Sequence, residues 1–363
     1  MSRVYFSRRP AQPSAQAGLS LVELMISVVL GFILILGVTE IYVNSKGTYR
    51  MTEEMSRAQE NARIAFEMLV PQVRMAGYTG CANLNTAPFT SIADITPTEL
   101  AELLSTTANA VGGNEAVSSS SWTPALDTTL AGLLKPPLAN TDVLTIQSSG
   151  GCDGGIVKKV PGAPEEKINI TNTCGIAADD LVMISDCQSV GLFKVTSITT
   201  GKGGGVSWQN LVHSKGKNGN TANGFSPQYG LDAEVFKPIS TSYYIATGAG
   251  AAPALWRLDN TATTPAPLEL VEGVENMQVT YGLDTDATPD GVVDRYVTAD
   301  AIPLAGHDWD RVIIARISLL VRSIEPVRTD NQSYTFAGIT TNDRYLRQEY
   351  TTTVQLRNRG LRP

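Results

Sequence analysis

The segment Gly18-Leu19-Ser20-Leu21-Val22-Glu23 opens an apolar run that continues through Val38. From Leu19 to Thr39 the only ionisable side chain is that of Glu23. A helix that spans a bilayer needs roughly 20 apolar residues, so the run is long enough for one span. A carboxylate at the edge of such a span is costly, which indicates that Glu23 has a specific partner.

Three common interpretations explain the run less well. A secretory signal peptide has its small-residue cleavage site after the apolar core. Here Ala15-Gln16-Ala17 precedes the core, and residues 40–45 offer no such site. A plain membrane anchor fits the length but leaves Glu23 unexplained. A buried helix of a globular core fits worst, because nearly every face of the run is apolar.

The glycine just before the run suggests instead that the chain is cut after Gly18. The new amino terminus at Leu19 and the carboxylate of Glu23 would then neutralise each other between neighbouring subunits. These residues resemble the class III signal of type IV prepilins, in which a short basic leader ends in Gly and Glu is the fifth mature residue. The resemblance implies that residues 1–18 are the leader, that prepilin peptidase cleaves after Gly18 and methylates Leu19, and that Glu23 serves assembly. The first mature residue here is Leu, where these proteins often have Phe.

Composition limits the class of protein. The chain has 363 residues, of which 42% are hydrophobic and 17% charged, as expected of a folded protein with a real core. Removing the leader with Arg3, Arg8 and Arg9 lowers the side-chain charge from −7 to −10. Nucleic-acid binders need a basic face, so we expect no nucleic-acid binding. The leader arginines predict a cytoplasmic N-terminus. With the span at about residues 19–41, the remainder of the chain is then outside the cytoplasm.

The four cysteines, Cys81, Cys152, Cys174 and Cys187, all lie in the part predicted to be extracytoplasmic, where disulfides persist. Four cysteines allow three pairings, and sequence alone does not decide among them. We favour Cys81–Cys152 and Cys174–Cys187. A structural zinc site is the alternative, but the chain has no Cys-x-x-Cys pair and only two histidines.

Beyond the span the helical pattern continues from Glu40 to Met75. Apolar residues near helical spacing predict an amphipathic second half: Met55, Ala58, Ala62, Ala65, Phe66 and Leu69. A helix from Leu19 to Met75 would be about 85 Å long at ~1.5 Å per residue. Because a bilayer is much thinner, the second half must pack on a globular domain. Pro71 is expected to kink or end the last turns, and Gly77 to stop the helix.

The rest of the chain is predicted to be mostly β. Thr96 is expected to cap a short helix over residues 97–108, and Gly112–Ser121 to form a surface loop. Later segments rich in β-branched and apolar residues predict strands: Asp142–Gln147, Lys167–Thr171, Leu181–Ser185, Leu192–Thr199, Val206–Val212, Ser242–Ala246, Ala254–Leu258, Leu268–Tyr281, Arg311–Arg322 and Tyr350–Arg357. The predicted fold class is α+β, with a long N-terminal helix over residues 19–76 packed on an antiparallel-rich β domain over residues 77–363.

Several segments resemble PilW-type minor pilins and keep that family's order along nearly the whole chain. These segments are Arg74–Tyr78 followed by Gly80-Cys81, Ser185–Cys187 leading into Phe193–Thr196, Val271–Met277 and Leu356–Arg359. The resemblance implies a minor pilin that helps to prime type IV pilus assembly at or near the tip. The implied partners are other minor pilins, the major pilin, a PilY-type tip adhesin and prepilin peptidase. The implied location is the inner membrane and then the pilus at the cell surface.

One acidic segment, residues 284–294, is a candidate metal site. Hard cations such as Ca²⁺ need several oxygen ligands, and Asp284, Asp286, Asp290 and Asp294 supply them from one loop. The order departs from the EF-hand pattern, because Asp290-Gly291 comes two residues late and Arg295 stands where a Glu would be needed. The alternative is a hairpin turn whose Asp and Gly residues satisfy turn geometry alone. No other cofactor is predicted.

The remaining candidates do not predict an enzyme. His213 and His307 stand near no nucleophile motif, and Gly201–Gly205 lacks the spacing of a phosphate-binding loop. The adjacent acids Asp179-Asp180 and Glu165-Glu166 point to different sides of a strand or turn, so neither forms a catalytic pair. The open alternatives are a J-type minor pseudopilin of type II secretion and an unprocessed, membrane-anchored, Ca²⁺-dependent adhesin.

Overall fold

The computed structural model describes residues 18, 20–78, 80, 82, 87–94, 109–118, 121–126, 128–156, 167–170, 175–203, 206–216, 219–225, 229–262, 264–288, 290–304 and 309–358. The helices are α1 (Leu21–Arg74), α3 (Thr128–Leu133), α4 (Ala301–Leu304) and the short 3₁₀ helix η1 (Trp309–Arg311). The strands are β1 (Phe89–Ser91), β2 (Val111–Ser118), β3 (Ser121–Thr123), β4 (Val143–Ile156), β5 (Lys167–Ile170), β6 (Leu181–Asp186), β7 (Ser189–Lys194), β8 (Ser197–Gly203), β9 (Val206–Val212), β10 (Glu234–Thr247), β11 (Pro253–Asp259), β12 (Leu268–Glu272), β13 (Val274–Leu283), β14 (Arg295–Val297), β15 (Val312–Arg322), β16 (Gln332–Phe336), β17 (Ile339–Asp343) and β18 (Arg347–Gln355). The predicted helix over residues 97–108 lies outside the described residues.

The chain divides into two compact units, residues 1–53 and residues 54–363. The described part of the first unit is almost entirely the N-terminal portion of α1. The second unit contains the rest of α1 and all the strands. A long N-terminal helix with an antiparallel-rich β region confirms the predicted α+β class.

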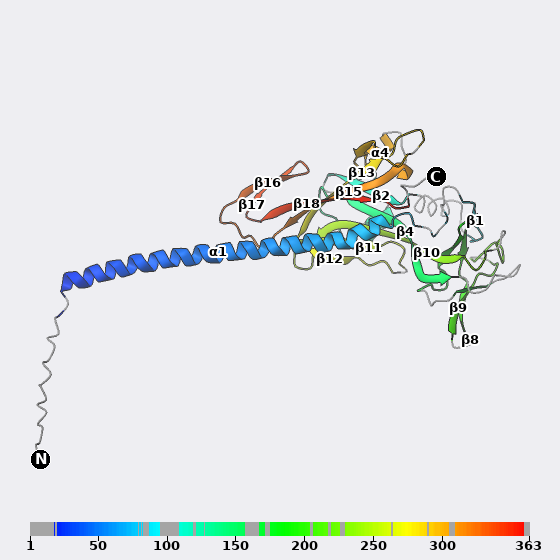
Figure 1. Ribbon diagram of the computed structural model, residues 1–363, viewed down its shortest axis with the longest axis horizontal. Helices are drawn as coiled ribbons and strands as arrows, with labels where there is room; N and C mark the ends of the chain where they lie inside the picture. Colours follow the sequence, from blue (N-terminus) through cyan, green and yellow to red (C-terminus); the bar gives the residue numbers. More distant parts are fainter. Residues whose placement is uncertain are drawn as a thin grey trace, which may run out of the picture. The chain divides into compact units, whose positions relative to one another are not determined.

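Among the described residues four sheets form the β region, and all their strand pairs are antiparallel except β1 with β7. The largest sheet has the order β1-β7-β6-β10-β4-β2-β3, and β11 and β12 extend it from β10. A second sheet has the order β14-β13-β15-β18, and a third β5-β9-β8. Strands β16 and β17 pair with each other as a hairpin and with no other described strand (Figure 1).

The second half of α1 packs through a narrow stripe of mostly small residues. These residues are Ala58, Ala62, Ala65, Leu69 and Val73, each at most 4% exposed. They recur three or four positions apart, so they lie on one face of the helix. They share one hydrophobic core with residues of β4, β10, β13 and β15, and Figure 1 shows this half of α1 lying along the strands. Burying Leu69 and Val73 stabilises the contact by roughly 1.5–3 kcal/mol each, and the alanines let the helix backbone approach closely.

Polar contacts fix this half of α1 at both ends. Near its start, the buried Glu54 accepts a hydrogen bond from the backbone N–H of Ile324 at 3.0 Å. Near its end, the chain turns at Gly77 with φ 72°, and the Gly77 N–H donates to the carbonyl of Gln147 in β4 at 2.7 Å. Gly77 therefore stops the helix as predicted, since a left-handed residue just past the last turn is a common helix end. Pro71 lies on the exposed face and does not end the helix before Arg74.

Three sequence predictions for the β region are wrong. The predicted Leu192–Thr199 strand is divided between β7, which ends at Lys194, and β8, which begins at Ser197 and belongs to another sheet. Residues 112–118 of the predicted Gly112–Ser121 loop lie in strand β2, which pairs with β4 and β3. At Gly113 a Cβ atom would lie only 2.1 Å from the hydroxyl oxygen of Tyr281, so glycine is needed for close packing within this strand. The predicted Leu268–Tyr281 strand is interrupted at Gly273, whose φ of 84° separates β12 from β13.

Candidate functional site

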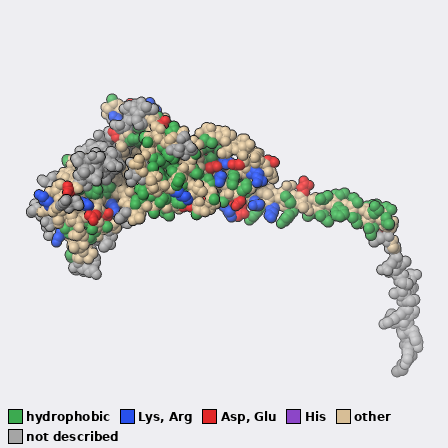
Figure 2. Space-filling view, turned by 180° about the vertical axis from the view of Figure 1, so that it is seen from behind, with side chains coloured by type: hydrophobic (Ala, Val, Ile, Leu, Met, Phe, Trp, Pro, Cys, Tyr) green, Lys and Arg blue, Asp and Glu red, His purple; other side chains and the backbone are tan. Residues whose placement is uncertain are grey.

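From Leu21 to Val38 the first unit presents an apolar helical surface, and Glu23 is the single carboxylate in that segment. Helix α1 begins at Leu21, and this is the one helix among the described residues with the length and composition to cross a membrane. The large hydrophobic side chains from Leu21 to Val43 are each about half to three-quarters exposed, and Figure 2 shows them covering this segment. Glu23 lies in the first helical turn, where the helix dipole favours a negative charge.

The structure describes Gly18 but not Leu19, so the position of the predicted cleavage product's amine is outside the described residues. The backbone carbonyl of Glu23 accepts a hydrogen bond from the Ser27 hydroxyl at 2.7 Å. The predicted roles of Gly18, Leu19 and Glu23 stay predictions.

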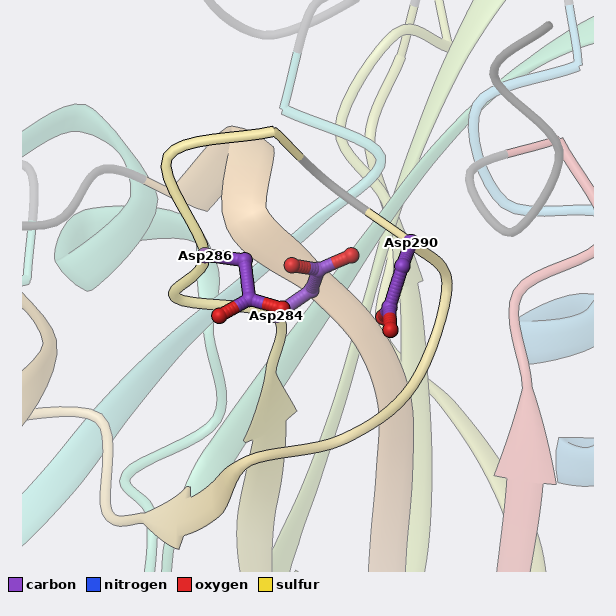
Figure 3. Close-up of side chains that lie close together, drawn as sticks. All are labelled: Asp284, Asp286 and Asp290. Carbon is purple, nitrogen blue, oxygen red and sulfur yellow. The ribbon is translucent and has the colours of Figure 1, made fainter.

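The acidic loop joins β13 to β14 and brings three carboxylates together. Asp284, Asp286 and Asp290 each offer a carboxylate oxygen, and these oxygens all lie within 4.8 Å of one another. Asp284 is only 1% exposed, whereas Asp286 and Asp290 are exposed. Figure 3 shows the three side chains pointing toward a common space.

Asp294, the fourth predicted ligand, lies next to this group but has another role in the loop. Its Oδ2 atom accepts hydrogen bonds from the backbone N–H and the hydroxyl of Thr285, at 2.6 and 2.8 Å. These hydrogen bonds lower the pKa of Asp294. The negative charge of Asp294 is in turn the first cause of a raised pKa at Asp286, followed by partial desolvation and the charges of Asp290 and Asp284. The loop therefore concentrates negative charge.

The predicted disulfide residues are only partly described. Cys187 lies in the exposed turn between β6 and β7 and is not a free thiol. The side chains of Cys81, Cys152 and Cys174 are outside what the structure describes. The pairing of Cys81 with Cys152 and of Cys174 with Cys187 therefore stays a prediction.

The other polar residues that the sequence singled out have structural roles. His213 is buried between the rings of Phe193 and Phe225, with ring centroids 5.2 and 6.1 Å away. Asp180 forms an ion pair with Lys237 at 2.9 Å, and Asp179 one with Lys194 at 3.3 Å, so the adjacent acids face different partners. Residues 165–166 and His307 lie outside the described residues.

Sequence reasoning missed a pair of acids between β2 and the start of β4. Asp142 is 3% exposed and accepts hydrogen bonds from the backbone N–H groups of Val279 and Ala116, at 2.9 and 3.2 Å. Burial raises the pKa of Asp142 to about 6. Burial also raises the pKa of Glu115 to about 7, and the charges of Asp142 and Asp300 add to this rise. No sequence signal connects these residues, because the sheet register alone brings them together.

Comparison with known proteins finds two family models that match parts of the chain. Residues 13–39 match the model of the prokaryotic N-terminal methylation motif, and residues 242–358 match the family described as type IV pilus-assembly protein W. The chain therefore combines a prepilin methylation motif with a PilW domain. A search of curated proteins found no match. A solved type IV-like pilin from Thermus thermophilus is similar at 17% identity, over 51% of this chain and 86% of that one, but its TM-score of 0.21 is too low to support an argument.

The two matches fall on the two regions described above. The methylation motif includes both Gly18 and Glu23, and the PilW match runs from β10 through β18 and includes the acidic loop. A PilW-type pilin is a structural protein of a filament and its assembly. That this chain has no enzymatic activity stays a prediction.

Proposed function

We propose that this chain is a PilW-type minor pilin that helps to prime assembly of a type IV pilus and sits at or near its tip. Before assembly, prepilin peptidase cleaves the chain after Gly18 and methylates Leu19. The observation that carries the proposal is the coincidence of the methylation motif at residues 13–39 with a helix whose apolar side chains are exposed all round.

The exposed apolar surface suits two environments in turn. In the inner membrane the helix is surrounded by lipid, with the basic leader in the cytoplasm and the β region in the periplasm. In a filament, a bundle of such helices offers similar apolar surroundings, so transfer from lipid to filament has a low cost. Glu23 then sets the register, because a carboxylate buried beside the Leu19 amine of a neighbour is more stable than an unpaired one.

The size of the second unit supports a position at the tip. Residues 54–363 form one compact unit on the C-terminal side of the span, and so large a domain would obstruct helical stacking of subunits on one side. A tip subunit has neighbours on one side only. The partners in this proposal are other minor pilins, the major pilin and a PilY-type tip adhesin, with the filament finally at the cell surface.

The test replaces Glu23 by Ala in the chromosomal copy and uses Glu40→Ala, on the same helix near the far end of the span, as the matched control. We expect loss of surface pili and twitching with Glu23→Ala and near wild-type piliation with Glu40→Ala. The mass of the membrane-extracted chain should correspond to loss of residues 1–18. Normal assembly with Glu23→Ala would contradict the register argument, and an uncut chain would indicate an unprocessed anchored adhesin instead.

Deletion of the gene distinguishes the pilus from the related secretion system. Loss of pili with normal exoprotein secretion supports the proposal. Loss of exoprotein secretion with intact pili would assign the chain to type II secretion as a minor pseudopilin.

A further inference from the structure

The geometry points to a Ca²⁺ site formed by Asp284, Asp286 and Asp290 in the loop between β13 and β14. Three carboxylate oxygens lie within 4.8 Å of one another there. Calcium binds oxygen at about 2.4 Å, so two ligands on opposite sides of the ion are about 4.8 Å apart. The three oxygens meet this limit, so they are close enough to one another to share one ion.

A buried oxygen without a partner is the second, independent observation. Asp284 is 1% exposed, its Oδ2 accepts the Gly291 N–H at 2.8 Å, and its Oδ1 is buried without a hydrogen-bond partner. Burying a carboxylate oxygen without a partner is costly. Because the Asp284 side chain points into the space that it shares with Asp286 and Asp290 (Figure 3), a bound cation would supply the missing partner.

The charges around the loop also lack compensation. Among the described residues, no lysine or arginine forms an ion pair with Asp284, Asp286 or Asp290. Arg311 is near, but its guanidinium donates to the backbone carbonyl of Asp286 at 3.1 Å. A divalent cation would neutralise most of a charge of −3 that the protein itself leaves unpaired.

The chemistry of the ligands favours calcium. Carboxylate oxygens suit hard cations, and calcium accepts irregular geometry with six to eight oxygens, whereas magnesium demands a near-ideal octahedron at about 2.0–2.1 Å. Three carboxylates from a loop, with two of them exposed, leave further positions for water or backbone carbonyls. Extracellular calcium modules of this type have Kd values of roughly 10⁻⁴–10⁻³ M, and we expect this range here.

An ion at this place would strengthen one edge of the second sheet. The Asp284 N–H donates to the carbonyl of Arg311, just before β15, and the Asp294 N–H donates to that of Leu283 at the end of β13. The loop is thus attached to both neighbouring strands, and its stability contributes to theirs. Stabilisation of the second sheet by a bound ion does not depend on the role proposed for Glu23 or on a position at the pilus tip.

The experiment measures the melting temperature (Tm) of the purified full chain in detergent micelles by tryptophan fluorescence, in EGTA, in excess Ca²⁺ and in equal Mg²⁺. We expect Ca²⁺ at about 100 times Kd to raise Tm by roughly 4–8 °C, and Mg²⁺ to raise it far less. The double variant Asp286→Asn/Asp290→Asn removes two exposed ligands and should abolish the response. The control Asp330→Asn removes an exposed loop carboxylate elsewhere and should keep it.

The double variant has a second readout that separates lost binding from misfolding. In EGTA its Tm should equal or exceed that of the wild type, because the substitutions relieve repulsion among the carboxylates. Three results would overturn the proposal: no calcium effect on the wild type, an equal effect of magnesium, or an unchanged calcium effect in the double variant. Calorimetric titration of the wild type should give one ion per chain.

Discussion

Replacing Glu115 by Gln should stabilise the folded chain at alkaline pH and change its stability little in mild acid. Glu115 in β2 lies near Asp142, Asp300 and the buried Tyr281, and none of these groups is positively charged. Burial and the neighbouring acids raise the pKa of Glu115 from 4.5 to about 7. A glutamine has the shape of the protonated acid, carries no charge and can still donate to the Asp142 carboxylate.

The sign follows from proton binding in the two states. With a raised pKa, the folded chain holds the Glu115 proton more tightly than the unfolded chain does. The contribution of Glu115 to the free energy of unfolding is therefore fully present below the unfolded pKa of 4.5. It is lost as pH rises through the folded pKa of about 7. Asp142, with a folded pKa of about 6, acts in the same direction. The two acids interact, so they titrate as a pair.

The magnitude is limited by the partial exposure of Glu115. A pKa rise of about 2.5 units corresponds to at most ~3.4 kcal/mol at about 1.36 kcal/mol per unit. Solvent screening of a partly exposed group reduces this by about half, to roughly 1.5 kcal/mol. For a unit of this size that corresponds to a Tm increase of roughly 2–4 °C for Glu115→Gln at about pH 8, and to almost none at about pH 5.

The assay compares Tm values of the wild type, Glu115→Gln and the exposed control Glu325→Gln, all as full chains in detergent at both pH values. Differences between variant and wild type cancel the pH response of all other groups. The Tm of Glu325→Gln should differ from that of the wild type by the same small amount at both pH values. If Glu115→Gln is no more stabilising at alkaline than at acidic pH, the reasoning about this buried pair is wrong.

Two further substitutions test the packing of the second unit. Leu69 is fully buried in the α1 stripe, so Leu69→Ala should lower the free energy of unfolding by about 2.7–5 kcal/mol. The Met68 side chain is 39% exposed, so Met68→Ala should lower it much less in the same thermal unfolding experiment. Gly113→Ala would place a Cβ atom 2.1 Å from the Tyr281 hydroxyl oxygen and should lower Tm. Gly132→Ala, in α3 with no atom within 4 Å of the added Cβ, should be neutral or slightly stabilising, and equal effects of the two glycine substitutions would argue against the packing at Gly113.

Local patterns in the sequence were enough to predict the elements whose causes are local. The apolar run and the spacing of Ala58, Ala62 and Ala65 predicted α1, and the density of Asp residues predicted the acidic loop. The loop prediction could not separate the role of Asp294 from that of its neighbours, because spacing does not show that its carboxylate turns toward Thr285.

The predictions failed where a distant residue decides the structure. Residues 112–121 were predicted to form a loop, but Gly113 lies in β2, where it pairs with β4 and leaves room for the Tyr281 hydroxyl. The pair Glu115 and Asp142 is equally invisible in the sequence, since one acid was assigned to that loop and the other begins a predicted strand. In each case the partner is set by sheet register, which no local pattern encodes.

Two of the segments that resemble PilW-type pilins in sequence, Arg74–Tyr78 and Leu356–Arg359, meet at the end of α1. The last carbonyls of a helix have no partners within the helix. Here the Arg357 N–H donates to the carbonyl of Arg74 at 3.2 Å, and the Asn358 side chain donates to that of Ala76 at 3.1 Å. On the same helix, Asn61 donates to the carbonyl of Glu272 at 2.9 Å. Residues just beyond β18 thus complete the helix end, while β12 binds its side. Because these bonds join the second half of α1 to residues after β18 and to β12, we expect a pulling force on this half of the helix to be carried into both the second sheet and the largest sheet.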